Sequence, residues 1–129
     1  MRERLAQELE LLRKLFPDVQ YMEDGWFKIP NHPLPPGWNR ANTDVAFLAR
    51  PGYPGTPPYG IYVPAGIQYQ GSVPTNYSEP ANPMPAFGGQ WGILSWSVDS
   101  GWRPTADLVS GSNLMNWARG IAERFKEGI

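Results

Sequence analysis

Residues 88–104 read GGQWGILSWSVDSGWRP, a stretch that holds three tryptophans and three serines. Over its whole length it has neither the periodicity of a helix nor the alternation of a strand. Glycine permits tight turns and tryptophan supplies large apolar surface, a combination typical of loops that shape a binding or catalytic site. The elements on either side of this stretch indicate which fold presents it.

Helical periodicity marks both ends of the chain. Apolar residues recur at helical spacing before Pro17 and predict an amphipathic helix over residues 2–16: Leu5, Leu9, Leu12 and Phe16. A second series near the C-terminus predicts another helix: Leu114, Trp117, Ala118, Ile121 and Phe125. Ser112 and Asn113 precede this second series and are candidate N-caps.

Four short segments between the helices alternate or are rich in β-branched and aromatic residues: VQYME at 19–23, WFKIP at 26–30, TDVAFLAR at 43–50 and YGIYVP at 59–64. Turn residues separate them, which is the pattern of an antiparallel meander. The proline-rich residues 64–90 are expected to form a long irregular loop that frames the site. The sequence therefore predicts an α+β fold that forms a single domain over residues 1–129.

Composition excludes several classes of function. The net charge is -1 and the longest basic run is the pair Arg13 and Lys14, which argues against nucleic acid or a membrane surface as a partner. Charges interrupt the N-terminal apolar run, and no stretch approaches the roughly 20 apolar residues of a membrane span, so a cytoplasmic protein is expected. The absence of cysteine rules out thiol nucleophiles, and one histidine argues against a histidine metal site. We expect neither a metal nor a cofactor.

Most charged residues lie in the terminal stretches 1–24 and 110–129, and the middle of the chain is aromatic and poor in charge. Such a surface is either buried or kept for a partner protein, because the centres of protein interfaces are depleted of charge.

Two motifs in the middle of the chain have a characteristic order. Tyr53-Pro54 and then Pro57-Pro58 stand before the fourth predicted strand, and Trp102 and Pro104 follow the serine-rich stretch. With the predicted order of helix, meander, loop and helix, this resembles the ubiquitin-conjugating (E2) fold. The resemblance is closest to prokaryotic E2-like proteins encoded beside ubiquitin-like proteins, E1-like activating proteins and JAB-type peptidases. It implies these three kinds of protein as partners.

In that family the catalytic cysteine follows a turn glycine and lies a few residues before the tryptophan. Here Gly92 stands where the turn glycine would be, and Ser95 stands close to the cysteine position. The His-Pro-Asn signature expected after the fourth strand is also absent; Asn31-His32-Pro33 has similar letters but lies before the third strand. The family's usual asparagine for oxyanion support is therefore missing, and Asn76 and Asn82 in the proline-rich loop are candidates without an assigned role.

The resemblance implies acyl transfer, with Ser95 carrying the C-terminus of a ubiquitin-like protein as an oxyester. A hydroxyl is a weak nucleophile that needs activation. Asp99 could accept its proton or orient the incoming amine, although a carboxylate of ordinary pKa is a poor base at neutral pH. The residues expected to shape this site are Gly92, Trp96, Trp102, Pro104, Tyr53, Pro54, Pro57 and Pro58.

Structural explanations exist for the same residues. Ser95 lies in an alternating stretch and fits a small polar position in a strand or turn, Ser97 and Ser100 are weaker alternative nucleophiles, and Asp99 fits a turn. Trp91, Trp96 and Trp102 are expected in the core, and His32 is expected to have a structural role.

Three functions are consistent with these patterns. The first is an E2-like carrier that acts through Ser95, and the second is an inactive E2 variant that binds a ubiquitin-like protein or an E1-like protein. The third abandons the resemblance and treats the tryptophans and prolines as a surface that binds a peptide or glycan.

Overall fold

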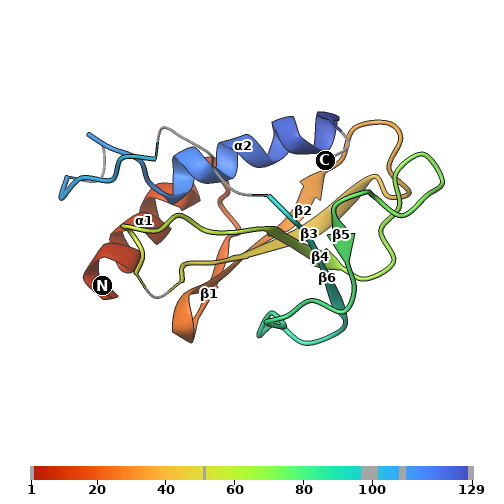
Figure 1. The fold of residues 1–129 in the computed structure, drawn as a ribbon. Coiled ribbons are helices and arrows are strands. Elements are labelled where there is room, and N and C mark those ends of the chain that lie inside the picture. Colours follow the sequence, from red (N-terminus) through yellow and green to blue (C-terminus); the bar gives the residue numbers. More distant parts are fainter. Residues whose placement is uncertain (1, 51, 97–101, 108–109, 128–129) are drawn as a thin grey trace.

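The computed structural model describes the chain except residues 1, 51, 97–101, 108–109 and 128–129 (Figure 1). The described part contains two α-helices and six strands, with one short 3-10 turn. In chain order these are α1 (Arg2–Leu15), β1 (Gln20–Met22), η1 (Glu23–Gly25), β2 (Trp26–Pro33), β3 (Asn42–Leu48), β4 (Ile61–Pro64), β5 (Tyr77–Ser78), β6 (Trp91–Leu94) and α2 (Leu114–Glu127).

The six strands form one antiparallel sheet in the order β1-β2-β3-β4-β6-β5. Strands β1 to β4 make the predicted meander. The prediction of a four-stranded sheet was wrong in the number of strands, because it missed β5 and β6. β6 escaped prediction because all four of its residues are buried, so that the alternation of a half-buried strand is missing. β5 has two residues and gives no periodic signal inside the proline-rich segment.

The ends of two strands also differ from the prediction. β2 continues through Asn31-His32-Pro33 with a register irregularity between Ile29 and His32, where Asn31 adopts a φ of 54°. β4 begins at Ile61, because Gly60 has a φ of 81° and leaves the strand conformation.

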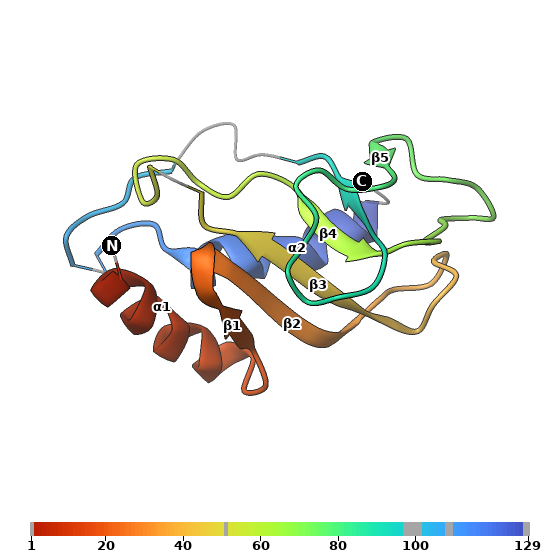
Figure 2. The ribbon, with the colours of Figure 1, turned by 90° about the horizontal axis from the view of Figure 1, so that it is seen from below.

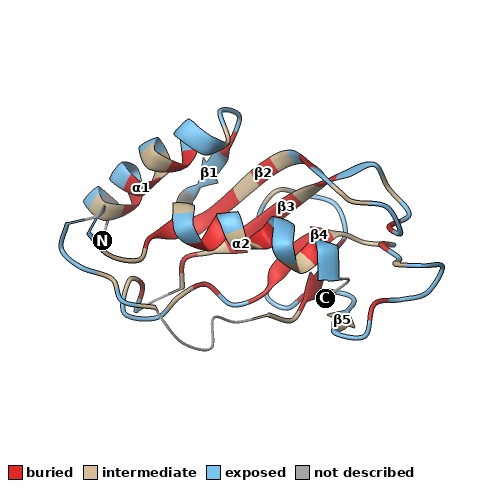
Figure 3. Cartoon of the chain, turned by 90° about the horizontal axis from the view of Figure 1, so that it is seen from above, coloured by how far each residue is buried: buried red, intermediate tan, exposed pale blue. Residues whose placement is uncertain are grey.

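Both helices lie on one face of the sheet, and α2 runs across the strands (Figures 1 and 3). All five apolar residues predicted for the C-terminal helix are buried there: Leu114, Trp117, Ala118, Ile121 and Phe125. Phe27 stacks on Phe47 with ring centroids 5.3 Å apart, and Phe47 contacts Trp117 at 4.9 Å. These contacts join the middle of the sheet to α2 in the main core.

The N-terminus of α2 is capped reciprocally. Asn113 Oδ1 accepts a hydrogen bond from the Asn116 N–H at 2.9 Å, and Asn116 Oδ1 accepts one from the Asn113 N–H at 3.2 Å. This confirms Asn113 as the cap and has the logic of a capping box, with an amide at each position. Ser112 instead accepts from the Arg103 N–H through its Oγ at 2.9 Å.

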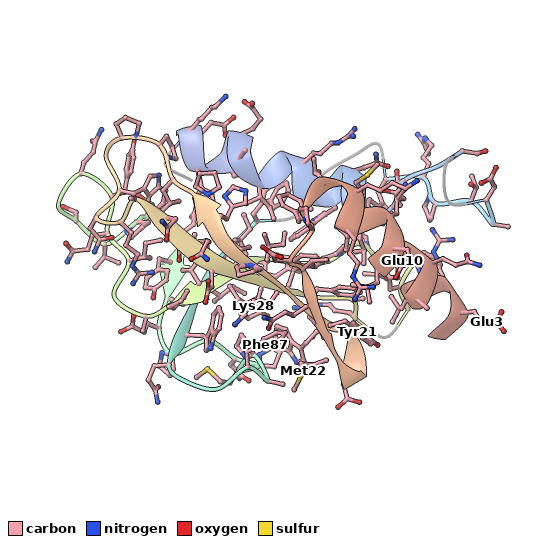
Figure 4. The ribbon with its side chains drawn as sticks, turned by 180° about the vertical axis from the view of Figure 1, so that it is seen from behind. Glu3, Glu10, Tyr21, Met22, Lys28 and Phe87 are labelled. Atoms are coloured by element: carbon pink, nitrogen blue, oxygen red, sulfur yellow. The ribbon has the colours of Figure 1, made fainter. Side chains whose placement is uncertain are left out.

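The other face of the sheet is covered by the segment between β5 and β6 (Figure 2). A second core forms there from Trp26, Ala46, Tyr62, Ala81, Trp91 and Ile93. Phe87 packs at its margin, with the Lys28 ammonium 5.4 Å from its ring centroid, and the exposed Met22 of β1 pairs with Trp26 of this core (Figure 4). Tyr21 pairs with Phe27 of the main core instead, with ring centroids 4.8 Å apart. Both faces of the sheet are therefore buried, which accounts for much of the low charge in the middle of the chain.

Neither helix, over the residues that are described, combines the length and the apolar character that crossing a membrane would need.

Candidate functional site

Ser95 lies one residue beyond the end of β6 and is half-buried. Its N–H donates to the carbonyl oxygen of Asn76 at 2.7 Å, and the Gly60 N–H donates to the carbonyl oxygen of Trp96 at 2.6 Å. The registers β4–β6 and β5–β6, continued by one residue, place Gly60 on one side of Ser95 and Asn76 on the other. The candidate serine is thus held by backbone pairing on both sides.

The alternation of β6 assigns Ser95 to a face of the sheet. Trp91 and Ile93 belong to the second core, whereas Leu94 belongs to the main core under the helices. Ser95 therefore shares the face of Ile93. Trp96 lies on the helix side, where its ring is 5.1 Å from that of Trp117 and the Arg124 guanidinium lies 5.4 Å from its centroid. Trp96 packs against α2 and does not contribute to the surface around Ser95.

Gly92 is not a turn glycine, contrary to the prediction. It is buried inside β6, opposite Val63. A Cβ at this position would overlap the Tyr77 hydroxyl, so glycine is needed to let the Tyr77 ring cross the strand. Tyr77 donates from its hydroxyl to Glu79 Oε1 at 2.7 Å, and burial together with this hydrogen bond raises the pKa of Tyr77 to about 12.

Asn76 is exposed and lies directly across the strand pair from Ser95. Residues paired in this way have Cβ atoms about 5 Å apart, within reach of a shared ligand. The sequence had offered Asn76 and Asn82 equally. Asn82 lies instead in the segment over the second core, and no local sequence signal distinguishes the two, because their positions depend on how β5 pairs.

Trp102 holds the loop that carries the tyrosine-proline motif. Its Nε1 donates to the carbonyl oxygen of Pro54 at 2.8 Å, and its ring centroid is 6.1 Å from that of the buried Tyr53. Trp102 also packs against the main core, as expected for a residue that pins a loop. Pro104 and Pro57 are half-buried and Pro58 is buried.

A buried carboxylate connects this region to α1. Glu8 accepts hydrogen bonds from Arg4 Nε at 2.9 Å, from the Tyr53 hydroxyl at 2.5 Å and from the Leu114 N–H at 2.6 Å. Arg4 Nη1 also donates to the carbonyl oxygen of Thr105 at 2.7 Å. Burial first, and then the bond to Glu8, raise the pKa of Tyr53 well above its ordinary value.

The sequence carried a signal for this cluster that our prediction did not use. Glu8 falls at helical spacing between Leu5 and Leu12, on the face of α1 that turns toward the core. A carboxylate in that position requires donors, and its place beside the first N–H of α2 also suits the dipole of that helix.

His32 is a core residue, as expected. It is buried, its Nδ1 lies 2.9 Å from the carbonyl oxygen of Pro33, and its ring lies between Phe16 at 6.0 Å and Phe125 at 5.5 Å. Burial lowers its pKa, with the contact to Pro33 acting in the opposite direction. His32 is six residues along β2 from Trp26, or about 20 Å in an extended strand, and Trp26 is the end of β2 nearer to Ser95.

Asp99, Ser97 and Ser100 lie outside the described residues, so the structure gives no contact between Asp99 and Ser95. Across the described ranges, no three His, Cys, Asp or Glu side chains gather closely enough to hold a metal ion.

No protein-family model matches this chain, and neither the curated proteins nor the solved structures show a significant similarity to it. Its function must therefore be argued from its own residues.

Proposed function

We propose that this chain is an E2-like acyl carrier, which accepts the C-terminus of a ubiquitin-like protein from an E1-like protein and holds it on Ser95. The observation that carries the proposal is the position of Ser95. It is half-buried at the end of a sheet strand, flanked by Gly60 and Asn76, in a fold that places one helix before a meander and another after the site.

In the proposed first step, the Ser95 hydroxyl oxygen attacks the carbonyl carbon of a thioester on the E1-like protein. The C–O bond forms, the C–S bond breaks, and the departing thiolate takes the hydroxyl proton. In the second step an acceptor amine attacks the ester, and the Ser95 oxygen leaves with a proton from that amine. An amide and a free serine result, so atoms and charges balance in both steps.

In this proposal Asn76 supplies the hydrogen-bond donor for the oxyanion that the family takes from the asparagine of its His-Pro-Asn signature. Its side-chain amide lies across the strand pair from Ser95, is exposed, and has two N–H donors. Such a donor stabilises the oxyanion that develops on the carbonyl during either step. In this proposal Asn76 acts on the reacting carbonyl and Ser95 carries the acyl group.

The partners under this proposal are a ubiquitin-like protein, an E1-like activating protein and a JAB-type peptidase of the same pathway. Such a pathway would operate in the cytoplasm of a bacterium.

A binding scaffold without chemistry is the second candidate. It is favoured because no side chain of the described residues accepts a hydrogen bond from the Ser95 hydroxyl, and His32 lies toward the far end of β2. The third hypothesis, a peptide- or glycan-binding surface, rests on the composition alone, and a fold without a helix packed across the meander would have favoured it. α2 does pack there, so the fold adds no support to that hypothesis (Figure 3).

The test is the intact mass of the purified protein after incubation with its E1-like and ubiquitin-like partners and ATP. We expect an adduct that survives reductant, is cleaved by base, and is absent from the Ser95→Ala variant. Ser78→Ala is the matched control, because Ser78 is an exposed serine on the neighbouring strand β5. Asn76→Ala should slow adduct formation by about 100-fold or more, the cost of losing one oxyanion donor.

Binding of the ubiquitin-like protein without any adduct would exclude the carrier and select the scaffold. An adduct that persists in Ser95→Ala would show that another residue carries the acyl group.

A further inference from the structure

Arg50 follows β3 and is half-buried. Its guanidinium carbon lies 5.4 Å from the ring centroid of Tyr59, which is 39% exposed. Its Nε is buried without a hydrogen-bond partner, and no carboxylate among the described residues forms an ion pair with it. Within the described part of the chain, Arg50 is therefore a positioned cation whose Nε–H has no acceptor.

Tyr62 lies beside Arg50 and has the same deficiency. Its side chain is wholly buried, and its hydroxyl proton has no acceptor among the described residues. Burial raises the pKa of Tyr62, and the charge of the nearby Arg50, together with a hydrogen-bonding contact from its guanidinium, opposes this shift. The Tyr62 ring is held edge-on against Trp26 with centroids 5.0 Å apart.

Other arginines in the chain have found acceptors. Arg4 binds Glu8, and Arg40 donates to the carbonyl oxygens of Pro64 at 3.0 Å and Ala65 at 2.6 Å. Buried donors left without partners are rare in folded proteins and cost free energy. Among the described residues, four buried side-chain atoms have no partner: Arg50 Nε, the Tyr62 hydroxyl, Trp117 Nε1 and Arg124 Nε. The pair on Arg50 and Tyr62 lies beside the exposed Tyr59, which indicates a place where an acceptor is supplied from outside.

The cluster of Arg50, Tyr59 and Tyr62 lies at the same end of the sheet as Ser95. Tyr62 pairs with Ile93 and belongs to the second core, so it shares the face of Ser95. Tyr59 precedes Gly60, which stands opposite Ser95. The antiparallel register of Ala46 with Tyr62 brings the end of β3, and Arg50 beyond it, toward the same edge.

We propose that Arg50, supported by Tyr59 and Tyr62, binds a carboxylate of a polypeptide partner. A planar guanidinium matches the two oxygens of a carboxylate, and the ring of Tyr59 fixes its plane. A single cation beside two neutral phenols balances one negative charge, whereas a phosphate dianion would be left half-neutralised. The exposed Tyr59 and the half-buried Pro57 offer apolar surface for the rest of a peptide.

This inference goes beyond the proposed function, because binding of a carboxylate does not require that Ser95 carry an acyl group. The carboxylate could be the C-terminus of the partner or an aspartate or glutamate side chain. The two sources have the same chemistry, and the experiment separates them.

The test is an NMR titration of the full-length protein that follows the Arg50 Nε–H signal. Three short peptides of alanine, glycine and serine are compared: one with a free C-terminus, one amidated, and one amidated with a single glutamate. We expect binding by the first or the third and none by the second. Arg50→Gln should weaken that binding by at least about tenfold, and Arg50→Lys, which keeps the charge and loses the planar fork, by less.

Arg119→Gln is the matched control, since Arg119 is an exposed arginine on α2, and it should leave binding unchanged. The inference is overturned if the amidated neutral peptide binds equally well, if no peptide binds, if inorganic phosphate competes more strongly than either carboxylate, or if Arg50→Gln has no effect. Carboxylate binding without an adduct on Ser95 would leave this site standing and remove only the acyl carrier.

Discussion

Two buried polar clusters of this protein differ in one respect. Around Glu8, each carboxylate oxygen is hydrogen-bonded, and the donors come from α1, from the loop at Tyr53 and from the start of α2. Around Arg50 and Tyr62, buried donors have no acceptor within the described chain. A satisfied cluster holds elements together, and an unsatisfied one costs free energy that a ligand can recover.

Two tyrosines make the comparison quantitative. Tyr53 is 1% exposed and Tyr62 is 0% exposed, so their rings are buried to the same extent. The Tyr53 hydroxyl donates to Glu8, whereas the Tyr62 hydroxyl has no acceptor among the described residues. Variants in these two clusters should therefore differ in sign as well as in size.

The largest effect is expected from Glu8→Ala. It leaves Arg4, the Tyr53 hydroxyl and the Leu114 N–H without their acceptor and should lower the free energy of unfolding by about 3–5 kcal/mol. Urea unfolding followed by tryptophan fluorescence measures this. Glu10→Ala is the control, because Glu10 is an exposed residue of α1 whose surface ion pair with Arg13 should contribute less than about 1 kcal/mol (Figure 4). Equal losses in the two variants would contradict a structural role for the Glu8 cluster.

Tyr53→Phe is expected to have the next largest effect. It removes one hydrogen bond to a buried carboxylate and should cost about 1.5–3 kcal/mol in the same urea experiment. The combination with Glu8→Ala should cost less than the sum of the single changes, since both remove one interaction. Strict additivity would argue that Tyr53 and Glu8 do not interact in solution.

The burial of His32 predicts how the free energy of unfolding depends on pH. Burial holds its pKa below the ordinary value of 6.5, so the unfolded chain binds the proton more tightly than the folded chain. The stability from this residue is present above pH 6.5 and is lost as the pH falls below that value, by at most about 1.4 kcal/mol per pH unit. Between about pH 7.5 and about pH 5.5, the unmodified protein should lose more stability than His32→Gln. The same loss in both proteins would show that His32 is not buried in its neutral form.

The smallest effect is expected from Tyr62→Phe. The hydroxyl it removes has no acceptor among the described residues, so the free energy of unfolding should change by less than about 0.5 kcal/mol or should increase. A loss as large as that of Tyr53→Phe would mean that Tyr62 has an acceptor in solution, and would remove one of the two observations behind the carboxylate site.

Much of the fold could be predicted from local pattern. The two helices follow from their helical periodicity, and the first four strands follow from short segments rich in β-branched and aromatic residues with turn residues between them. β6 could not be found in this way, since the segment between β5 and β6 covers its second face and abolishes the alternation. β5 has only two residues and exists because β6 is there to pair with.

The candidate site was predicted less completely than the fold. Trp102 and the Tyr53-Pro54 motif do lie together, as expected for residues that shape one site. Gly92 was expected at a turn because it stands where the family's turn glycine would be, whereas here it makes room for Tyr77. Asn76 could not be placed beside Ser95, because their proximity depends on the register of two strands joined by the irregular residues 79–90.

The amino-acid sequence by itself determined the helices, the meander and the absence of thiol chemistry, because these depend on residue type and on spacing within a few residues. The tertiary structure alone decided which polar groups are paired. Glu8 finds its donors in Tyr53 and Leu114, whereas Arg50 Nε and the Tyr62 hydroxyl find no acceptor in the part of the chain that the structure describes. Burial and hydrogen bonding depend on segments that meet only when the sheet and the helices have packed.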